Sequence, residues 1–305
     1  MLISFCYAVT WKKMKEVWVS NSYAKINIGL NVLKRLDSGY HNIETGFCFI
    51  EWTDRFEITP SSRNSLTMSD EKIPVDDTNL IVKAVNLLEK EAGLKDQFRI
   101  TVQKNIPSGA GLGGGSSNAA TTLRMINKIA NLGLQEKELM ELGKKLGADV
   151  PFFIQGKPGF ATGLGTEIEP LDIQPDGWIV TIFPGEPSST PEAYNFVEPN
   201  PEPEFSLRNV LADEPLEEWE YLIINDLEAS VFPRMNIVGN IKDQCYEFGA
   251  RYASMSGSGS SVFGIFEQDF VAIHAYESFH SLGFSANLSR PLFKPDLGIY
   301  KKQID

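Results

Sequence analysis

The chain has 305 residues, 42% of them hydrophobic and 22% charged, which is enough for one large or two medium domains with hydrophobic cores. Its formal net charge of −12 disfavours nucleic acid as a partner, because a phosphate backbone binds basic surfaces. The three cysteines lie far apart and form no C-x-x-C pattern, so we expect free thiols and neither a disulfide framework nor a zinc site. No apolar stretch is long enough to span a membrane, so we predict a cytoplasmic protein without a membrane partner.

The first predicted element is a strand at 23–33, which follows an N-terminal extension of residues 1–15 to which we assign no role. In the sequence YAKINIGLNVL, apolar and polar residues alternate, a pattern typical of a strand that is buried on one face. This alternation places Lys25 and Asn27 side by side on the polar face. Further strands are predicted at TGFCFIEW and RFEITP, and the pattern DTNLIVKAVNLLEKEAG predicts a helix that ends at Gly93.

The sequence FRITVQKNI predicts one more strand, after which the chain enters PSGAGLGGGSSNAA, residues 107–120. Five of the seven residues from Gly109 to Gly115 are glycine. Apolar residues then recur at helical spacing, so we expect a helix that starts near Ser116 or Ser117 with serine or asparagine as its N-cap.

A second helix at QEKELMELGKKLG leads into ADVPFFIQG, in which Asp149 lies among apolar residues. The segment 183–205 contains six prolines and predicts an irregular connection, within which Thr190 and Pro191 are suited to open a short helix. The later patterns predict a helix around NDLEASVF, a strand–turn–strand at GARYASMSGSGSSVFGIFE and a helix around DFVAIHAYESFHSLG. Strands and helices in two blocks favour an α+β fold in two lobes.

Three known types of glycine-rich segment fit the stretch poorly. A flexible linker is disfavoured because a strand precedes the stretch and a capped helix follows it. Gly109, Gly111 and Gly114 satisfy the dinucleotide pattern G-x-G-x-x-G, but a second helix stands where the required second strand should be. A Walker P-loop needs G-K-[ST], and this loop contains no lysine. What remains is the property that both phosphate loops share, a helix N-terminus whose free N–H groups bind an anion.

The stretch resembles the P-x-x-x-G-L-G-[GS]-S-S-x-A-A signature of the GHMP kinases, the superfamily of galactokinase, homoserine, mevalonate and phosphomevalonate kinases. In that superfamily the loop wraps the phosphates of ATP, so the resemblance implies phosphoryl transfer from ATP with Mg²⁺. It does not assign the magnesium ligands, although the loop serines are candidates. The nucleotide-binding residues that it implies are Pro107, Ser108, Gly109, Ala110, Gly111, Leu112, Gly113, Gly114, Gly115, Ser116 and Ser117, with Asn79 and Lys104 as further contacts.

The blocks AKINIGLNVLKRLDSGYHNIETGF, DTNLIVKA, GADVPFF and MSGSGSSVFGIF resemble, in this order, one branch of the superfamily over about residues 24–266. Members of that branch phosphorylate the 2-hydroxyl of 4-diphosphocytidyl-2-C-methyl-D-erythritol in the non-mevalonate isoprenoid pathway. The resemblance implies a small-molecule kinase whose partners are ATP and this cytidine-diphosphate methylerythritol. We expect a monomer or a weak homodimer.

At the matching positions, the resemblance implies that Asp149 takes the proton of the acceptor hydroxyl, while Lys25 keeps Asp149 ionised and stabilises the developing charge. Because an ordinary aspartate, with a pKa of about 3.9, is a weak base at neutral pH, we expect orientation and electrostatics to contribute more than basicity. The residues alone are equally consistent with Lys25 as a solvated lysine on an edge strand and Asp149 as a cap or turn aspartate.

The pair Tyr40 and His41 is the most branch-specific feature of the chain. The resemblance implies that Tyr40 stacks on the cytosine ring and that His41 hydrogen-bonds to the edge of the ring. Without the resemblance, SGYH is a turn that ends in an ordinary aromatic pair. The resemblance makes Tyr194 a second platform for the base. The other implied acceptor-binding residues are Asn27, Thr190, Gly257 and Gly259.

The resemblance also implies a two-lobed α+β GHMP kinase fold, with an N-terminal lobe like domain 2 of ribosomal protein S5 and a ferredoxin-like α/β C-terminal lobe. We predict an ATP-binding and catalytic domain at 16–169 and a C-terminal domain at 170–305. Two other functions stay open: another small-molecule GHMP kinase, such as a mevalonate or homoserine kinase, and a catalytically inactive member that acts as a sensor. The presence of Lys25 and Asp149 argues against the sensor.

Overall fold

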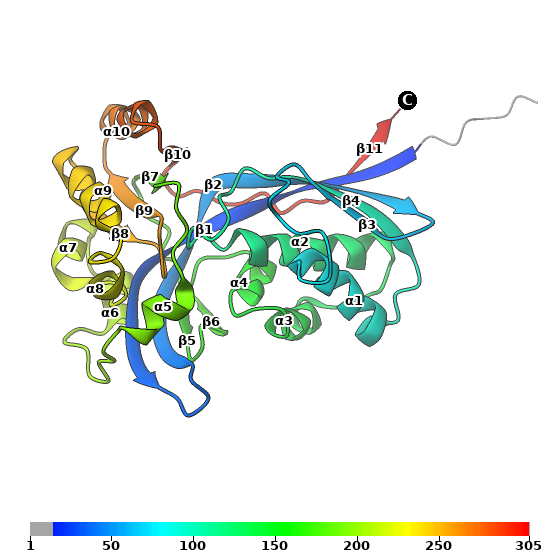
Figure 1. The fold of residues 1–305 in the computed structure, drawn as a ribbon, viewed down its shortest axis with the longest axis horizontal. Coiled ribbons are helices and arrows are strands. Elements are labelled where there is room, and N and C mark those ends of the chain that lie inside the picture. Colours follow the sequence, from blue (N-terminus) through cyan, green and yellow to red (C-terminus); the bar gives the residue numbers. More distant parts are fainter. Residues whose placement is uncertain (1–14, 305) are drawn as a thin grey trace, which may run out of the picture.

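The computed structural model describes residues 15–304, which form two lobes, each built on one β-sheet (Figure 1). The first sheet has the strand order β11-β1-β2-β4-β3, with β5 paired to β2 and β6 paired to β5. Its strands are β1 (Lys15–Arg35), β2 (His41–Ser61), β3 (Ser65–Met68), β4 (Gln97–Gln103), β5 (Gly159–Thr162), β6 (Glu167–Pro170) and β11 (Tyr300–Ile304). The helices of this lobe are α1 (Leu80–Ala92), α2 (Gly114–Ile129), α3 (Glu136–Lys144) and α4 (Val150–Gln155).

The second sheet has the order β10-β7-β9-β8, and all its neighbouring strands are antiparallel. Counted along the chain, this is the order 4-1-3-2 of a ferredoxin-like lobe, with α9 before the second strand and α10 before the fourth. The strands are β7 (Trp178–Phe183), β8 (Tyr252–Met255), β9 (Val262–Phe266) and β10 (Ser285–Ser289). The helices are α5 (Thr190–Asn195), α6 (Leu207–Asp213), the 3-10 helix η1 (Leu216–Glu218), α7 (Trp219–Leu222), α8 (Glu228–Val231), α9 (Asn236–Glu247) and α10 (Asp269–Ser281).

The two longest strands, β1 and β2, connect the lobes (Figure 1). The predicted strand 23–33 lies inside β1, but it is not buried on one face only: Lys25 is 4% exposed and Asn27 is 3% exposed. The reason is tertiary, because the glycine loop and the turn after β8 cover the polar face of this strand. The expectation of a half-buried strand was therefore wrong, as was the alternative of a solvated Lys25.

The helices of the first lobe cover one face of its sheet, and their apolar faces build its core (Figure 1). Helix α1 ends as the sequence predicts, at Gly93 in the left-handed conformation with φ of 68°; at its start the Asn79 side chain accepts a hydrogen bond from the Ile81 amide. A second core cluster lies between the lobes and joins Ile26 and Ile50 to Phe263 of β9. This apolar contact fixes the lobes relative to each other, since burial of such side chains stabilises association.

Helix α2 starts earlier than the sequence predicts, at Gly114 rather than near Ser116 or Ser117. Its N-cap is Gly113, whose φ of 67° lies in the left-handed region, and no side chain caps the helix. A positive φ suits glycine and strains serine or asparagine, so backbone conformation decided the cap rather than hydrogen-bonding preference. The predicted serine or asparagine N-cap was wrong.

The end of the chain returns to the first lobe, because β11 pairs antiparallel with β1 (Figure 1). This return was not foreseen in the predicted C-terminal domain 170–305, and the boundary near residue 169 stays a prediction. Apart from Lys15, the first residue of β1, the predicted extension 1–15 lies outside the described residues. The described cysteines, Cys48 and Cys245, are buried free thiols, as predicted.

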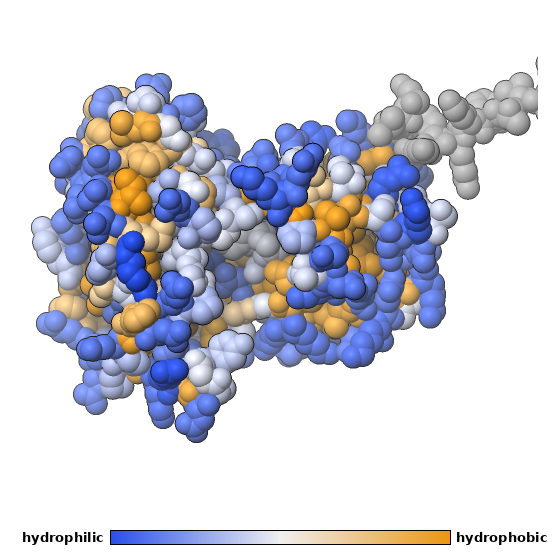
Figure 2. Space-filling view, in the orientation of Figure 1, coloured by the Kyte–Doolittle hydropathy of each residue, from blue (hydrophilic) through white to orange (hydrophobic). Residues whose placement is uncertain are grey.

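The surface in Figure 2 is largely hydrophilic on the face shown, with a notch between the two lobes. Among residues 15–304, no helix is long and apolar enough to cross a membrane. The notch is where the site described below opens, between the ends of elements from both lobes.

Candidate active site

Lys25 lies at the centre of the site, on the buried part of β1. Its ammonium donates hydrogen bonds to the Asn27 side-chain oxygen and, over 3.1 Å, to the Gly111 carbonyl. It forms an ion pair with Asp149 at 3.5 Å and lies 5.2 Å from the centre of the Phe47 ring. The main chain is held as well, since the Lys25 amide donates to the Leu112 carbonyl over 3.0 Å. Lys25 therefore joins strand β1 to the glycine loop through both its side chain and its main chain.

Burial lowers the pKa of Lys25, because removal from water disfavours the charged ammonium, while the Asp149 carboxylate opposes this shift. Asp149 immediately precedes α4, yet its side chain makes no capping hydrogen bond. Its side chain is 30% exposed and faces the same cavity as Lys25. Asp149 therefore stands in the turn at the N-cap position of α4, as the alternative expected, but without a capping bond its carboxylate is available to a ligand.

The glycine loop encloses a cavity of about 300 Å³ on the side of α1. All ten residues from 107 to 116 line this cavity, together with Leu80 and Lys104. Gly109, Gly111 and Gly113 have φ values of 67°, 77° and 67°, a conformation that L side chains rarely adopt. Their backbone turns the chain into the N-terminus of α2, where unpaired N–H groups and the helix dipole favour an anion.

The loop glycines are also required by packing between the lobes. A Cβ on Gly111 would overlap the Ser256 carbonyl oxygen and lie 3.0 Å from the Gly259 carbonyl oxygen. The Ser256 hydroxyl donates to the Gly111 carbonyl over 2.9 Å, and the Ser261 amide donates to the Ala110 carbonyl over 3.1 Å. The glycine loop of the first lobe and the glycine turn of the second therefore contact each other through their backbones.

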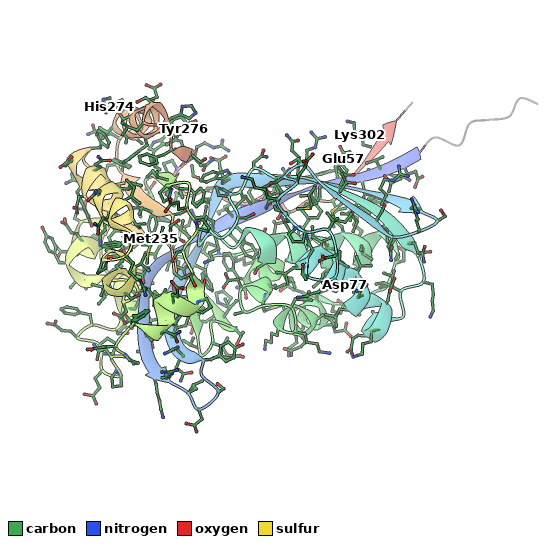
Figure 3. All side chains as sticks on the ribbon, in the orientation of Figure 1. Glu57, Asp77, Met235, His274, Tyr276 and Lys302 are labelled. Carbon is green, nitrogen blue, oxygen red and sulfur yellow. The ribbon has the colours of Figure 1, made fainter. Side chains whose placement is uncertain are left out.

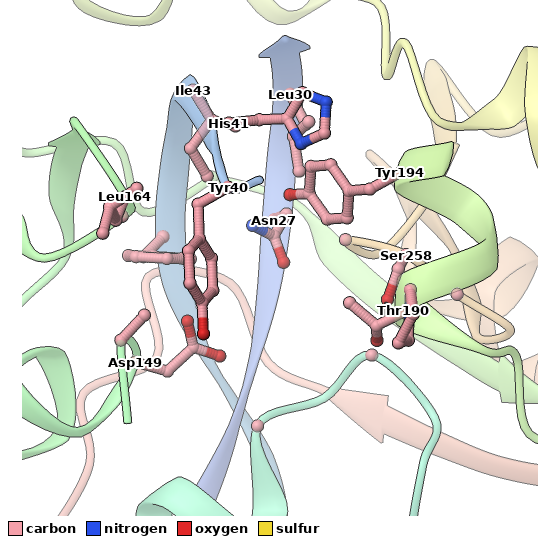
Figure 4. A pocket seen from close by; sticks show the side chains of 18 of the residues that line it. Asn27, Leu30, Tyr40, His41, Ile43, Asp149, Leu164, Thr190, Tyr194 and Ser258 are labelled. Atoms are coloured by element: carbon pink, nitrogen blue, oxygen red, sulfur yellow. Dashed lines mark hydrogen bonds between the residues drawn. The ribbon is translucent and has the colours of Figure 1, made fainter. Parts of the chain in front are cut away.

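A second, larger cavity of about 500 Å³ opens next to the loop (Figure 4). Lys25 and Asp149 lie at its boundary with the loop, because Gly109, Gly111 and Gly113 line both cavities. Every residue expected to bind the acceptor lines this larger cavity. These residues belong to β1, β2, α5, the turn after β8 and the segment before β2. These residues are Asn27, Tyr40, His41, Thr190, Tyr194, Gly257 and Gly259.

His41 and Tyr194 form a stacked pair at the end of this cavity opposite Asp149 (Figure 4). Their ring centres are 5.2 Å apart with an interplanar angle of 28°. Burial, and secondarily the charge of Arg35, lower the pKa of His41, so the imidazole is neutral at pH 7. Tyr40 is 66% exposed, and its hydroxyl end points toward Asp149 in Figure 4. A neutral imidazole can both donate to and accept from a base edge.

The remaining wall is polar and tightly held. The Asn27 side-chain nitrogen donates to the Thr45 hydroxyl over 2.9 Å, and the Asn27 backbone N–H donates to the Ser256 hydroxyl over 3.2 Å. A Cβ on Gly257 would lie 2.9 Å from the Asn27 side-chain oxygen, so the turn can only approach the strand as glycine. Thr190 and Ser258 share a hydrogen bond of 2.8 Å.

Two of the residues expected at the nucleotide do not line either cavity. The Asn79 side chain caps α1 and donates to the Pro74 carbonyl over 2.6 Å, while its neighbour Leu80 lines the loop cavity. Ser117 is buried and accepts a hydrogen bond of 2.7 Å from the Ser22 hydroxyl. Their direct contact with a nucleotide stays a prediction that this conformation does not favour.

Several residues of the site were not identified from the sequence. Phe47 and Leu164 line the larger cavity, and Ser256 joins the two glycine segments. Phe47 and Ser256 lie inside blocks that were singled out for other residues, so only the pairing of strands and turns reveals their position. Asp54, which is fully buried beside the loop, lies between the predicted strands TGFCFIEW and RFEITP, and nothing in the sequence singled it out.

Comparison with known proteins assigns a class to this fold and site. The family model of the GHMP kinases N terminal domain matches residues 79–157, which include the glycine loop and Asp149. The family model of the GHMP kinases C terminal region matches residues 214–283, which include the second glycine turn. The two lobes are thus those of a GHMP kinase, a small-molecule kinase that uses ATP.

Individual relatives narrow the class. The chain is 46% identical over 249 residues to a 4-diphosphocytidyl-2-C-methyl-D-erythritol kinase of Parabacteroides distasonis, covering 80% of this chain and 90% of the relative. It is 42% identical over 252 residues to a kinase of the same name from Bacteroides fragilis, with coverage of 81% and 91%. A crystal structure of 4-(cytidine 5′-diphospho)-2C-methyl-D-erythritol kinase superposes with a TM-score of 0.75 at 32% identity, covering 89% of this chain and 98% of that one. The chain belongs to the family of 4-diphosphocytidyl-2-C-methyl-D-erythritol kinases.

Proposed function

We propose that the protein transfers the γ-phosphoryl group of ATP to the 2-hydroxyl of 4-diphosphocytidyl-2-C-methyl-D-erythritol, giving the 2-phosphate and ADP. The observation that carries this proposal is the Lys25–Asp149 ion pair, at 3.5 Å, on the boundary between the two cavities. A donor phosphate in the loop cavity and an acceptor hydroxyl in the larger cavity would meet at this pair. Phosphoryl transfer requires mainly such positioning and charge stabilisation.

The loop cavity would hold the triphosphate of ATP. The backbone N–H groups at the start of α2 would donate to phosphate oxygens, and hydrogen bonds to a charged group contribute about 1.5–3 kcal/mol each. Several such bonds can offset the net charge of −12, which otherwise repels a nucleotide. Lys104, which lines this cavity, would add a positive charge on the side of α1.

Magnesium would enter with the nucleotide. Among the described residues, no group of three or more histidine, cysteine, aspartate or glutamate side chains could hold a metal ion on its own. Mg²⁺ keeps several waters and is usually held by substrate phosphates with one or two carboxylates, so the single carboxylate of Asp149 beside the loop is compatible with it. When bound, the ion would neutralise charge on the phosphates; its ligands stay unassigned.

The larger cavity would hold the cytidine end of the acceptor at His41. This imidazole is neutral at pH 7 and 8% exposed, so it can hydrogen-bond to the Watson–Crick edge of cytosine without a desolvated charge. The stacked rings of His41 and Tyr194 leave no space for a base between them. The cytosine ring would therefore stack on the accessible ring of Tyr40, with Tyr194 holding the orientation of His41.

In the reaction, the acceptor 2-hydroxyl oxygen forms a bond to the γ-phosphorus while the bond from the γ-phosphorus to the bridging oxygen of ADP breaks. The hydroxyl proton passes to the Asp149 carboxylate and from there to water, because this side chain is partly exposed. The Lys25 ammonium stabilises negative charge that develops between the two oxygens. Asn27 and the Gly111 carbonyl fix the direction of the ammonium.

A turnover screen tests the proposal. The purified protein is supplied with Mg-ATP and, in separate reactions, the cytidine-diphosphate methylerythritol, mevalonate and homoserine, and ADP and the phosphorylated product are measured. We expect turnover with the cytidine compound alone. Turnover only with mevalonate or homoserine would contradict the acceptor assignment, and ATP binding without any turnover would favour a sensor.

A further inference from the structure

Behind the glycine loop lies a cluster of five polar side chains, of which the proposed chemistry uses only Lys104. They come from β1, β2, the residue after β4 and the first turns of α2, and together they connect the sheet to the loop. The Lys104 side chain is 6% exposed, and each of the other four residues is at most 3% exposed. The cluster consists of Ser22, Asp54, Lys104, Ser117 and Asn118.

Asp54 is the centre of the cluster and is fully buried. One of its oxygens accepts from the amides of Asn105 and Ile106, over 2.8 and 2.9 Å. The other accepts from the Asn118 side chain over 2.8 Å and forms an ion pair with the Lys104 ammonium. A buried carboxylate is stable only when its charge is compensated in this way. The two amides belong to the residues immediately before Pro107, so Asp54 also fixes the start of the loop.

Lys104 occupies a place where a lysine is unfavourable without a partner. It lines the loop cavity, and its nitrogen lies 3.4 Å from the position of a Cβ on Gly114, the first residue of α2. The N-terminus of a helix carries partial positive charge and repels a cation. The negative charge of Asp54 offsets this repulsion in the free protein. A bound anion would gain from both the ammonium and the helix N-terminus, so the arrangement is suited to a phosphate.

Asn118 links this ion pair to the rest of the cluster. Its amide nitrogen donates to Asp54 and, over 2.9 Å, to the Ser22 hydroxyl, while its oxygen accepts from the Lys104 ammonium over 3.3 Å. Ser22 in turn donates to Ser117 in the first turn of α2. The ammonium is therefore held from two sides, by a residue of the sheet and by a residue of the helix that it faces.

We propose that Asp54 is a positioning residue for the nucleotide: it acts through Lys104, whose ammonium it holds at the mouth of the loop cavity for a phosphate of ATP. This inference rests on the proposed assignment of the loop to ATP. It assigns to Asp54 no contact with substrate. Its effect is on nucleotide affinity, and it leaves the acceptor cavity unchanged, because no member of the cluster other than Lys104 lines either cavity.

The test is a double-mutant cycle on nucleotide binding, which needs no acceptor. Calorimetry measures the dissociation constant of the protein for the magnesium complex of the β,γ-imido analogue of ATP. The four proteins compared are wild type, Asp54→Asn, Lys104→Met and the double variant. Asparagine keeps an oxygen for the two loop amides but removes the charge that holds Lys104. We expect each single variant to bind about tenfold more weakly, and the double variant to bind no more weakly than either single one.

A double variant that loses about a hundredfold would overturn the inference, because additive losses mean that Asp54 acts on the fold and not through Lys104. An unchanged affinity in Asp54→Asn would overturn it as well. The control is Glu51→Gln, which makes the same chemical change on the same strand at an exposed ion pair with Arg290, and should bind as wild type does. Thermal unfolding of every variant separates loss of affinity from loss of fold.

If Asp54→Asn does not fold, Asn118→Ala takes its place in the cycle. It removes one of the two holders of the ammonium and leaves the loop amides on Asp54, so we expect about a threefold loss that disappears in the Lys104→Met background. Persistence of that loss would overturn the inference. Failure of the proposed function is visible separately: wild type that does not bind the analogue contradicts the ATP assignment, and wild type that binds it but fails in the turnover screen contradicts only the acceptor.

Discussion

The two halves of the cleft, which we propose bind the donor ATP and the acceptor, are built by opposite means. The donor half is one continuous segment, residues 107–116, and it offers mainly backbone. The acceptor half is assembled from side chains of β1, β2, α5 and the turn after β8, which lie up to about 230 residues apart in the sequence. A triphosphate carries the same negative oxygens in every kinase reaction, and backbone N–H groups suffice to bind it. A cytidine-linked polyol needs shape and specific polar groups, which only side chains supply.

This difference explains why the halves tolerate change differently. A side chain added to the donor loop disturbs both the ligand surface and the contact with the second lobe, because Gly111 lies against the Ser256 carbonyl. A side chain removed from the acceptor half removes one contact and leaves the others in place. Lys25 and Asp149 line the acceptor cavity, but Lys25 also donates to the Gly111 carbonyl of the loop, so the pair lies where the two halves meet.

The largest expected effect is at that boundary. Asp149→Asn keeps the size of the side chain but cannot take the proton of the acceptor hydroxyl or pair with the Lys25 ammonium. We expect kcat to fall about a thousandfold while the dissociation constant for ATP changes less than about threefold, since proton transfer contributes about 10²–10⁴ in rate. Steady-state kinetics and calorimetry measure the two quantities. Asp96→Asn, at an exposed position, controls for the change in net charge; comparable turnover in Asp149→Asn and wild type would contradict the role.

The next prediction tests whether the donor loop requires glycine for packing against the second lobe as well as for binding the ligand. Gly111→Ala adds a Cβ that overlaps the Ser256 carbonyl at a φ of 77°, so we expect the free energy of unfolding to fall by about 2–4 kcal/mol. Gly133→Ala is a matched control: its φ is 75° but nothing lies within 4 Å of its Cβ, so only the cost of the backbone conformation, about 1–2 kcal/mol, should appear. Equal losses in urea unfolding would show that contact with the second lobe contributes nothing.

A smaller effect is expected in the acceptor half. His41→Ala removes the neutral imidazole proposed to bind the cytosine edge, and we expect the KM for the acceptor to rise about tenfold while the KM for ATP stays constant. His274→Ala is the control, because His274 is exposed on α10 at the outer end of the second lobe (Figure 3). Equal increases in both KM values would contradict the separation of the cleft into donor and acceptor halves.

The smallest expected effect is the contribution of His41 to the pH dependence of the free energy of unfolding. Burial lowers the pKa of His41 in the folded state below its ordinary value of 6.5, so the unfolded chain binds the proton more readily. The stabilising contribution is complete above about pH 6.5 and is lost as the pH falls through the folded pKa. Wild type should therefore lose more stability than His41→Asn between pH 7.5 and pH 5 in urea unfolding. Parallel curves for the two proteins would contradict a buried, neutral His41.

Individual residues show how far sequence reasoning reached. Alternation predicted the strand around Lys25, and the Gly93 stop of α1 was predicted correctly, because both are local patterns. The N-cap of α2 was predicted as serine or asparagine from hydrogen-bonding preference, whereas the turn requires the positive φ of Gly113. The pairing of β11 with β1 was not foreseen, because nothing local in Tyr300–Ile304 identifies its partner.

The sequence by itself determined the family, the glycine loop and the two residues that we propose as the catalytic pair, because these depend on short segments whose conformation and chemistry are local. The tertiary structure decided which of those segments contact each other and how far their charged side chains are buried. It buried Lys25, and it left the Asp149 carboxylate free of any capping bond. It also placed Asp54 behind Lys104. Burial and pairing of charges depend on contacts between distant strands and turns, and water is excluded only once both lobes have packed.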